Sequence, residues 1–191
     1  MFCKMGYYNT KKGIEEYILR SQDWKGPKID KILKKYLPKH ATLLELGMGP
    51  GQDFELLQKI YQSTGSDKSK RFLERYKKTH KGSKLVKLDA ITIRTNKKFD
   101  CIFSNRVLHH LTKSELKRSL ARQKEVLNQD GIAFHTFWKG KITEKKRGLL
   151  FIYYQKEQLK KILKQHFDVL ELEIFSADEK DDSIYVVLKK N

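Results

Sequence analysis

The stretch Leu43-Leu44-Glu45-Leu46-Gly47-Met48-Gly49-Pro50-Gly51 decides how this chain folds. A short apolar run with one carboxylate leads into three glycines at alternate positions, and a helical pattern begins after them. A chain that leaves a strand and turns at once into a helix needs positive φ and no Cβ, which glycine supplies without strain. The pattern predicts a strand, a tight turn and a helix, with backbone N–H groups close to a bound ligand.

The spacing of these glycines argues against the two common phosphate-binding loops. A dinucleotide fingerprint would need glycine in place of Gln52, and a P-loop would need a Gly-Lys-Ser/Thr sequence that the loop does not have. Glu45 lies two residues before the first glycine, where its carboxylate would repel a phosphate. The loop therefore favours a cationic or hydroxyl-rich ligand, and a glycine-rich turn without a ligand is the alternative.

Length and composition predict a single domain. With 191 residues, 39% of them hydrophobic, the chain can bury one sizeable core. No repeat, low-complexity segment or proline-rich linker divides it. We expect one domain over residues 1–191, with a helical N-terminal cover at residues 1–40 and a ligand-binding core at residues 41–191.

Cysteine usage and hydropathy indicate the compartment. Cys3 and Cys101 provide no disulfide framework, which is typical of a reducing environment, so we expect a cytoplasmic protein. The longest apolar stretch, Leu149 to Tyr154, is too short to cross a bilayer, and the N-terminal residues do not resemble a signal peptide. No membrane partner is expected.

The net charge of +18 raises the question of a polyanionic partner. Lysine accounts for 33 of the 41 basic residues and is scattered over apparently solvated helix faces. Arginine would be the stronger sign of phosphate recognition, because its planar fork binds two oxygens at once. A lysine-rich solvated surface is therefore favoured, and a nucleic-acid partner stays open as the alternative.

Apolar periodicity predicts alternating strands and helices. Strands are expected at residues 41–46, 62–67, 84–89, 99–105, 132–138, 169–175 and 183–188. Helices are expected at residues 29–37, 53–60, 70–78, 112–127 and 159–167, with a capping box at the start of the fourth. This order predicts an α/β fold, with a doubly wound, Rossmann-like, seven-stranded and mostly parallel sheet whose final strand is antiparallel.

Polar side chains follow the first four predicted strands. In an open α/β sheet, ligands bind beyond the carboxyl ends of the strands, where Glu45, Asp67, Asp89 and Asn105 are expected to lie. Asp67 comes 22 residues after Glu45, close to the ~20-residue spacing at which an acidic residue meets ribose hydroxyls. Capping of the following segment is the structural alternative for both aspartates.

These ordered motifs, from about residue 41 to the C-terminus, resemble class I S-adenosylmethionine-dependent methyltransferases. The glycine loop matches the first motif of that family, and Asp89-Ala90 and the stretch Phe99 to Leu111 match later ones. The resemblance implies S-adenosyl-L-methionine as cofactor and S-adenosyl-L-homocysteine as product. It also implies the roles, with Glu45 and the loop at the amino-acid end, Asp67 at the ribose, Asp89 and Ala90 at the adenine, and Asn105 at the reacting side. The expected cofactor-binding set is Glu45, Gly47, Met48, Gly49, Gly51, Ser66, Asp67, Asp89, Ala90 and Asn105.

Two departures from the family pattern matter. Ser63, Thr64 and Ser66 stand where the family has a more apolar second strand. The Asn-Pro-Pro-aromatic motif of enzymes that methylate exocyclic base amines is missing, which argues against that activity.

The adjacent pair His109 and His110 is the candidate catalytic feature. In the resembled family such a pair lies at the mouth of the active site, where one imidazole can accept a proton. Structural hydrogen bonding is the alternative. A metal site is not expected, because adjacent histidines without a third His or Cys nearby do not provide converging ligands.

The predicted function is transfer of a methyl group to a small-molecule acceptor by in-line displacement. Two alternatives stay open, a tRNA or RNA methyltransferase and a non-catalytic cofactor-binding regulatory module. Aromatic residues at 138–154, together with Tyr7, Tyr8 and Tyr17, are expected to form either a lid or a hydrophobic wall. The sequence does not indicate the oligomeric state.

Overall fold

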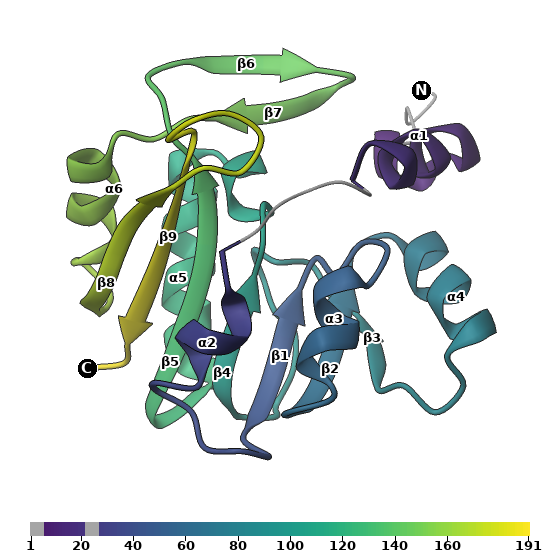
Figure 1. The fold of residues 1–191 in the computed structure, drawn as a ribbon, viewed down its shortest axis with the longest axis horizontal. Coiled ribbons are helices and arrows are strands. Elements are labelled where there is room, and N and C mark those ends of the chain that lie inside the picture. Colours follow the sequence, from purple (N-terminus) through teal and green to yellow (C-terminus); the bar gives the residue numbers. More distant parts are fainter. Residues whose placement is uncertain (1–5, 22–26) are drawn as a thin grey trace.

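A seven-stranded sheet forms the centre of the molecule (Figure 1). The computed structural model describes residues 6–21 and 27–191, so that Cys3 lies outside the described residues. The strand order is β3-β2-β1-β4-β5-β9-β8, and β9 is antiparallel to both of its neighbours while β1 to β5 pair in parallel. This confirms the predicted fold. The strands are β1 Thr42–Leu46, β2 Gln62–Asp67, β3 Leu85–Lys87, β4 Phe99–Ser104, β5 Leu127–Trp138, β8 Asp168–Phe175 and β9 Ser183–Lys189.

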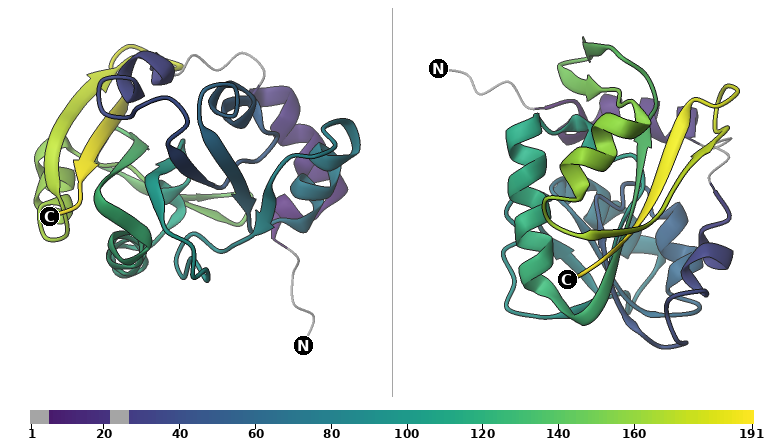
Figure 2. Two further views of the ribbon diagram at one scale, coloured as in Figure 1. Left: turned by 90° about the horizontal axis from the view of Figure 1, so that it is seen from below. Right: turned by 90° about the vertical axis from the view of Figure 1, so that its left-hand side faces the viewer.

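Helices cover both faces of the sheet (Figure 2). One core contains residues of α2 and α3 packed on β1, β4 and β5, and a smaller cluster beside it joins α3 to α4. The other core contains residues of α5 and α6. Because both faces are covered, the central strands are apolar on both sides, as in other parallel sheets. The helices are α2 Ile29–Leu33, α3 Gln52–Leu57, α4 Lys70–Thr79, α5 Lys113–Val126 and α6 Lys156–Leu163.

The polar second strand forms at the place where its position in the chain predicts it. β2 is paired in parallel on both sides, with β1 and with β3, so backbone hydrogen bonds compensate for its low strand propensity. A Cβ on Gly65 would come within 2.6 Å of the Met48 sulfur and 3.0 Å of Leu85, so only glycine lets these side chains pack against the strand.

Several local predictions are confirmed and others are wrong in detail. Thr112 and Glu115 form the expected capping box of α5. The helix expected at residues 29–37 is shorter than predicted: α2 ends at Leu33 and turns follow it. The strand expected at residues 132–138 begins earlier, at Leu127 of β5, and contains Asp130 with φ of 60°, where the pairing with β4 is irregular.

Two segments lie above the carboxyl ends of the parallel strands (Figure 1). The first is the N-terminal cover, made of η1 Tyr7–Asn9 and α1 Lys11–Ser21. The second is a hairpin of β6 Thr143–Lys146 and β7 Leu149–Ile152, which was not predicted. A short 3-10 helix, η2 Leu108–His110, lies between β4 and α5. Within residues 6–21 and 27–191, no helix is long and apolar enough to cross a membrane.

Replacing a core aromatic of β4 should destabilise the fold strongly. Phe103 is fully buried and stacks on Phe134 with ring centroids 5.4 Å apart. We expect Phe103→Ala to lower the free energy of unfolding by about 3–5 kcal/mol, because a cavity remains where the ring was. Leu170→Ala is the control, since this side chain is 41% exposed, and its effect should stay within about 0.5 kcal/mol. Urea denaturation followed by circular dichroism measures both, and equal effects would contradict the assigned core.

Candidate functional site

Three adjoining cavities open at the carboxyl ends of the strands, and Tyr17 and Arg106 line all three. The first, of about 270 Å³, includes Glu45 and Asn105. The second, of about 280 Å³, lies beside Asp67. The third, of about 670 Å³, lies under the N-terminal cover and the β6–β7 hairpin. We call them the loop cavity, the Asp67 cavity and the outer cavity.

Glu45 is a buried carboxylate in the wall of the loop cavity. It is 2% exposed, and its Oε2 atom has no hydrogen-bond partner among the described residues. Burial raises the pKa of Glu45 well above its usual range, and the nearby carboxylates of Asp53 and Asp67 raise it further. An unsatisfied buried carboxylate of this kind is costly and favours a cationic or hydrogen-bond-donating ligand.

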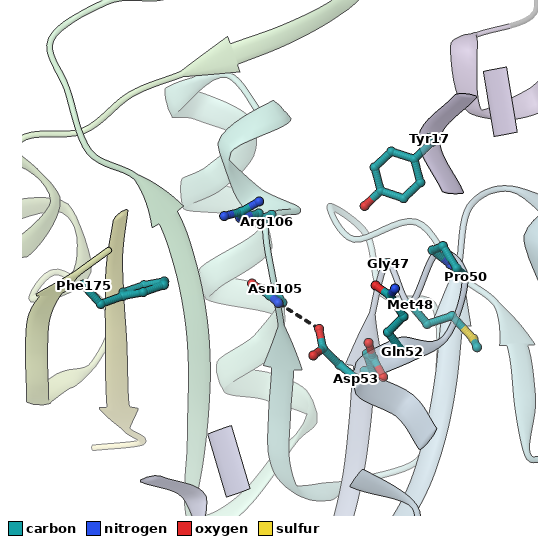
Figure 3. A pocket seen from close by; sticks show the side chains of 10 residues that line it. Tyr17, Gly47, Met48, Pro50, Gln52, Asp53, Asn105, Arg106 and Phe175 are labelled. Carbon is teal, nitrogen blue, oxygen red and sulfur yellow. Dashed lines mark hydrogen bonds between the residues drawn. The ribbon is translucent and has the colours of Figure 1, made fainter. Parts of the chain in front are cut away.

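Asn105 and Asp53 are joined by a hydrogen bond in the wall of the loop cavity (Figure 3). The Thr136 hydroxyl donates to Asn105 Oδ1, and Asn105 Nδ2 donates to Asp53 Oδ2 at 2.8 Å. Burial raises the pKa of Asp53, although Asn105 and Arg106 oppose the shift. The cavity thus has two carboxylates, from β1 and α3, and an amide whose direction is fixed by a neighbouring strand.

The three glycines of the loop have different tasks. All have positive φ, of 71° at Gly47, 50° at Gly49 and 95° at Gly51. Gly49 donates its backbone N–H to Asp67 Oδ2 at 3.0 Å, and Gly47 and Gly49 line the Asp67 cavity. A Cβ on Gly51 would come within 2.3 Å of the Tyr76 ring, so this glycine allows α4 to pack against the loop.

Asp67 at the end of β2 holds the loop and faces the cavity named after it. In addition to Gly49, it accepts from the Ser69 backbone N–H, at 2.7 Å on Oδ1. Burial raises its pKa, and these backbone hydrogen bonds oppose the shift. Ser69 stands at the N-cap position of α4 but makes no capping bond, and its hydroxyl donates to the Tyr8 carbonyl.

Ser66 and Met48 belong to the expected set but their side chains have neighbours within the protein. The Ser66 hydroxyl donates to the Glu45 carbonyl at 2.6 Å, and Ser66 does not line any of the three cavities. The Met48 side chain is 4% exposed and packs with Phe54 and Tyr76, although the residue also borders the loop cavity. Their roles toward a ligand stay predictions.

Asp89 and Ala90 form the far end of the Asp67 cavity. Asp89 accepts from the Ile91 backbone N–H at 2.8 Å and pairs with Lys68 Nζ at 2.7 Å. Burial alone would raise the pKa of Asp89, but Lys68 and Ile91 bring it below its usual value. Apolar side chains complete this cavity, which suits a flat apolar ligand with a polar edge; they include Phe72, Leu88, Val107 and Leu111.

His109 lies in the wall of the outer cavity with both ring nitrogens buried and lacking hydrogen-bond partners among the described residues. It is 1% exposed, and its ring lies 5.5 Å from that of Phe151. Burial lowers the pKa of His109 well below its usual range, and His110 and Arg106 lower it further. The imidazole is therefore neutral, with one nitrogen available to accept a proton and the other to donate a hydrogen bond.

His110 is hydrogen-bonded on both sides. Its Nδ1 contacts the Leu150 carbonyl at 2.6 Å, so Nδ1 carries a proton, and Nε2 can then accept from the Tyr8 hydroxyl at 3.4 Å. These contacts join η2 to the β6–β7 hairpin and to the N-terminal cover. His110 is thereby placed to position both segments over the cavities, and its catalytic role stays a prediction.

Three residues of the site were not assigned to it from the sequence. Asp53 has the pattern of a first-turn residue that complements a helix dipole, Tyr17 that of a lid residue, and Arg106 follows a strand-end motif without a role of its own. All three residues lie near the carboxyl ends of the strands. The sequence places Arg106 there, because it follows a predicted strand directly, but it cannot show that α1 brings Tyr17 over the sheet.

A comparison with protein families finds a match that covers these strand ends. Residues 44–135 match the family described as "Methyltransferase domain". That segment begins in β1, contains the glycine loop, Asp67, Asp89 and Asn105, and ends in β5. No curated protein matches the chain in sequence.

Solved methyltransferase structures share the fold. The 1,6-didemethyltoxoflavin-N1-methyltransferase of Burkholderia thailandensis, crystallised with bound 1,6-didemethyltoxoflavin and S-adenosylhomocysteine, has a TM-score of 0.79 at 16% identity, over 93% of this chain and 83% of that one. N-methyltransferase NodS of Bradyrhizobium japonicum, in complex with S-adenosyl-l-homocysteine, has a TM-score of 0.68 at 18% identity, over 95% and 98%. Magnesium protoporphyrin IX methyltransferase of Synechocystis has a TM-score of 0.72 at 13% identity, over 97% of this chain and 94% of that one.

Removing the charge of Glu45 should stabilise the protein without a ligand. A carboxyl whose pKa is higher in the folded than in the unfolded state loses stability as pH rises above its unfolded pKa. We therefore expect Glu45→Gln to raise the free energy of unfolding by about 0.5–2 kcal/mol at pH 8, with a smaller gain at pH 5. Urea denaturation at both pH values measures the difference. The exposed control Glu179→Gln should show no such gain, and a destabilised Glu45→Gln at pH 8 would contradict the assignment.

Proposed function

We propose that this chain, which belongs to the class I S-adenosylmethionine-dependent methyltransferases, transfers a methyl group to a small-molecule acceptor bound in the outer cavity. The observation that carries the proposal is the buried Glu45 carboxylate, which lies just before the glycine loop. Its Oε2 atom lacks a hydrogen-bond partner among the described residues. When bound, S-adenosylmethionine supplies a methyl group on a cationic sulfur, ready for in-line displacement by a nucleophile.

The residues of the first two cavities fit this cofactor. Glu45 and Asp53 offer carboxylates to an ammonium group in the loop cavity, and Asn105 lies beside them. Asp67 accepts backbone hydrogen bonds from Gly49 and Ser69, and its carboxylate oxygens have further lone pairs that could accept from ribose hydroxyls. Asp89, Ala90 and the apolar side chains around them would hold the adenine. Tyr17 and Arg106 line all three cavities, so the methyl group would lie near them.

The protein's contribution to the reaction is orientation and exclusion of water. Tyr8 and Tyr17 of the N-terminal cover pack edge to face with ring centroids 5.2 Å apart, over the Asp67 cavity. The β6–β7 hairpin contributes Leu149 and Phe151 to the outer cavity. These segments enclose a volume suited to a compact acceptor.

His109 is the proposed proton acceptor. Neither ring nitrogen has a partner among the described residues, so the unprotonated nitrogen of the neutral imidazole could accept a hydrogen bond, and then a proton, from the nucleophilic group of the acceptor. The burial that keeps the ring neutral also makes it a weaker base than an exposed histidine. His109 would take the proton that the nucleophilic group loses, while the bound cofactor would supply the methyl group and its sulfur would keep the electrons of the broken carbon–sulfur bond. An acceptor whose nucleophilic group loses its proton to solvent would not need His109 as a base.

The net charge of +18 keeps RNA as the second candidate acceptor, and a non-catalytic cofactor-binding module is the third. The decisive experiment is transfer of labelled methyl groups into a fractionated lysate. We expect label in the small-molecule fraction. Label in RNA, with binding that weakens steeply as salt increases, would favour the second candidate, and cofactor affinity without turnover on any fraction would favour the third. The cytoplasmic location stays a prediction.

Replacing Asp67 should weaken cofactor binding. Asp67→Asn converts one acceptor oxygen into an amide donor, which disturbs the Gly49 or Ser69 contact and removes a partner for the ribose hydroxyls. We expect the affinity for S-adenosylhomocysteine to fall about 10- to 100-fold, equivalent to about 1.4–2.7 kcal/mol. Isothermal titration calorimetry measures it. The matched control Asp168→Asn, on an exposed residue at the start of β8, should bind like the unaltered protein.

Replacing His109 should reduce turnover while leaving cofactor affinity unchanged. We expect His109→Gln to lower kcat by about 10²- to 10⁴-fold, with S-adenosylhomocysteine formed from a metabolite extract as the readout. Because burial lowers the pKa of His109, the unaltered protein should keep its rate as pH falls through about 6.5, the ordinary value. His166→Gln, outside the cavities, is the control. A normal rate in His109→Gln would assign proton removal to solvent.

A further inference from the structure

We propose that the acceptor in the outer cavity carries a carboxylate or phosphate group, attached to a planar ring that reaches toward His109. The inference rests on the proposed methyl transfer and specifies the chemistry of its acceptor. Among the described residues, the wall of the outer cavity has four basic side chains, Arg20, Arg106, Lys146 and Arg147, and one carboxylate, Asp178.

Arginine makes up a larger share of the basic residues in the wall of the outer cavity than in the chain as a whole. Only 8 of the 41 basic residues are arginine, yet three of the four in this wall are, and they come from α1, the end of β4 and the β6–β7 hairpin. The lysine-rich composition alone would place mainly lysine in this wall. Arginine presents a planar fork of donors that matches the two oxygens of a carboxylate or phosphate.

The ion pairs within the protein distinguish these four side chains. Arg106 lies 4.1 Å above the Trp138 ring and pairs with Asp178 at 3.4 Å, and Lys146 pairs with Glu144 at 2.8 Å. These two cations are therefore already engaged with carboxylates.

Arg20 and Arg147 are less committed, and both lie beside Tyr7. Arg147 Nε is 3.9 Å from Glu16 Oε2, at the limit of an ion pair, and its guanidinium is 6.0 Å from the centre of the Tyr7 ring. Arg20 Nη2 donates to the Tyr7 hydroxyl at 3.1 Å, and in the described part of the chain no carboxylate pairs with Arg20. An anion at this place would gain two guanidinium partners, with Glu16 as the opposing charge, since Glu16 also accepts from Tyr7 at 3.1 Å.

The residues at the two ends of the outer cavity differ in their exposure to solvent. Arg20 and Arg147 are exposed, whereas His109 is 1% exposed, so the basic pair lies at the mouth and the imidazole at the inner end. Phe151 stacks on His109 with an interplanar angle of 28°, and Trp138 and Tyr153 lie 6.3 Å apart between their ring centroids. Aromatic walls of this kind favour a flat ring between the anionic group and the nucleophile.

The charges on the cofactor side support the same orientation. Glu45 and Asp53 in the loop cavity and Asp67 next to it would repel an acceptor anion and attract a cationic cofactor. The anionic group would consequently stay at the mouth, and the atom to be methylated would lie at the inner end. Because the anionic group is not the methylated atom, the product keeps its charge.

The test compares matched ligands with and without charge. In the presence of saturating S-adenosylhomocysteine, calorimetry measures the affinities of 4-hydroxybenzoate, phenyl phosphate and the neutral 4-hydroxybenzamide. We expect at least one anion to bind about tenfold more tightly than the amide, as for a charge-assisted hydrogen bond. This preference should fall to about twofold in Arg20→Gln and Arg147→Gln. It should persist in Lys12→Gln and Lys145→Gln, exposed residues of the same helix and hairpin that do not line the cavity.

The outcomes separate this inference from the proposed function. Failure to bind S-adenosylhomocysteine would overturn the proposed function itself. Normal binding of S-adenosylhomocysteine, with equal affinity for anion and amide or with no anion bound at millimolar concentration, would overturn the anionic acceptor alone. Binding of tRNA that requires Arg20 and Arg147 would also overturn it, by assigning the arginines to a nucleic-acid backbone.

Discussion

The buried Glu45 carboxylate is the constraint around which the site is organised. It lies in a fully covered strand and is held there by the fold, while its Oε2 has no partner among the described residues. The protein without a ligand therefore bears the desolvation cost, and a cation in the loop cavity would offset it. Binding of such a ligand would in this way add to the stability of the fold.

The two sides of the site have opposite charge. Glu45, Asp53 and Asp67 surround the cofactor side, and arginines from three separate elements surround the outer cavity. Tyr17 and Arg106 line the cavities on both sides and divide them. Burial of Tyr17 raises the pKa of its hydroxyl, so it stays a neutral donor between the two charged regions. This polarity would orient a cationic cofactor and the proposed anionic acceptor with their reacting ends together.

The sheet could be predicted from the sequence because local patterns determine it. Glu45, Asp67 and Asn105 end neighbouring strands, and the topology of a parallel sheet places such residues at one edge. The cover could not be predicted in the same way. Tyr8 lies in the N-terminal cover and Arg147 in the turn of the β6–β7 hairpin, both outside the sheet. The first strand of that hairpin, Thr143–Lys146, is polar and weakly periodic. Their positions depend on long-range contacts, such as those of His110 with Tyr8 and Leu150, for which sequence spacing carries no signal.

A buried polar chain explains how the strand ends keep their positions within an apolar core. Ser104, next to Asn105, contacts His135 Nδ1 at 2.8 Å, and His135 Nε2 contacts Gln123 at 2.8 Å. Burial lowers the pKa of His135 to about 3, so the ring is neutral. Gln123 then donates to Ser119, whose hydroxyl donates to the Ala90 carbonyl at 2.6 Å. Since every member has a partner, the chain costs little to bury and links Asn105 at one end of the site to the Ala90 loop at the other through α5.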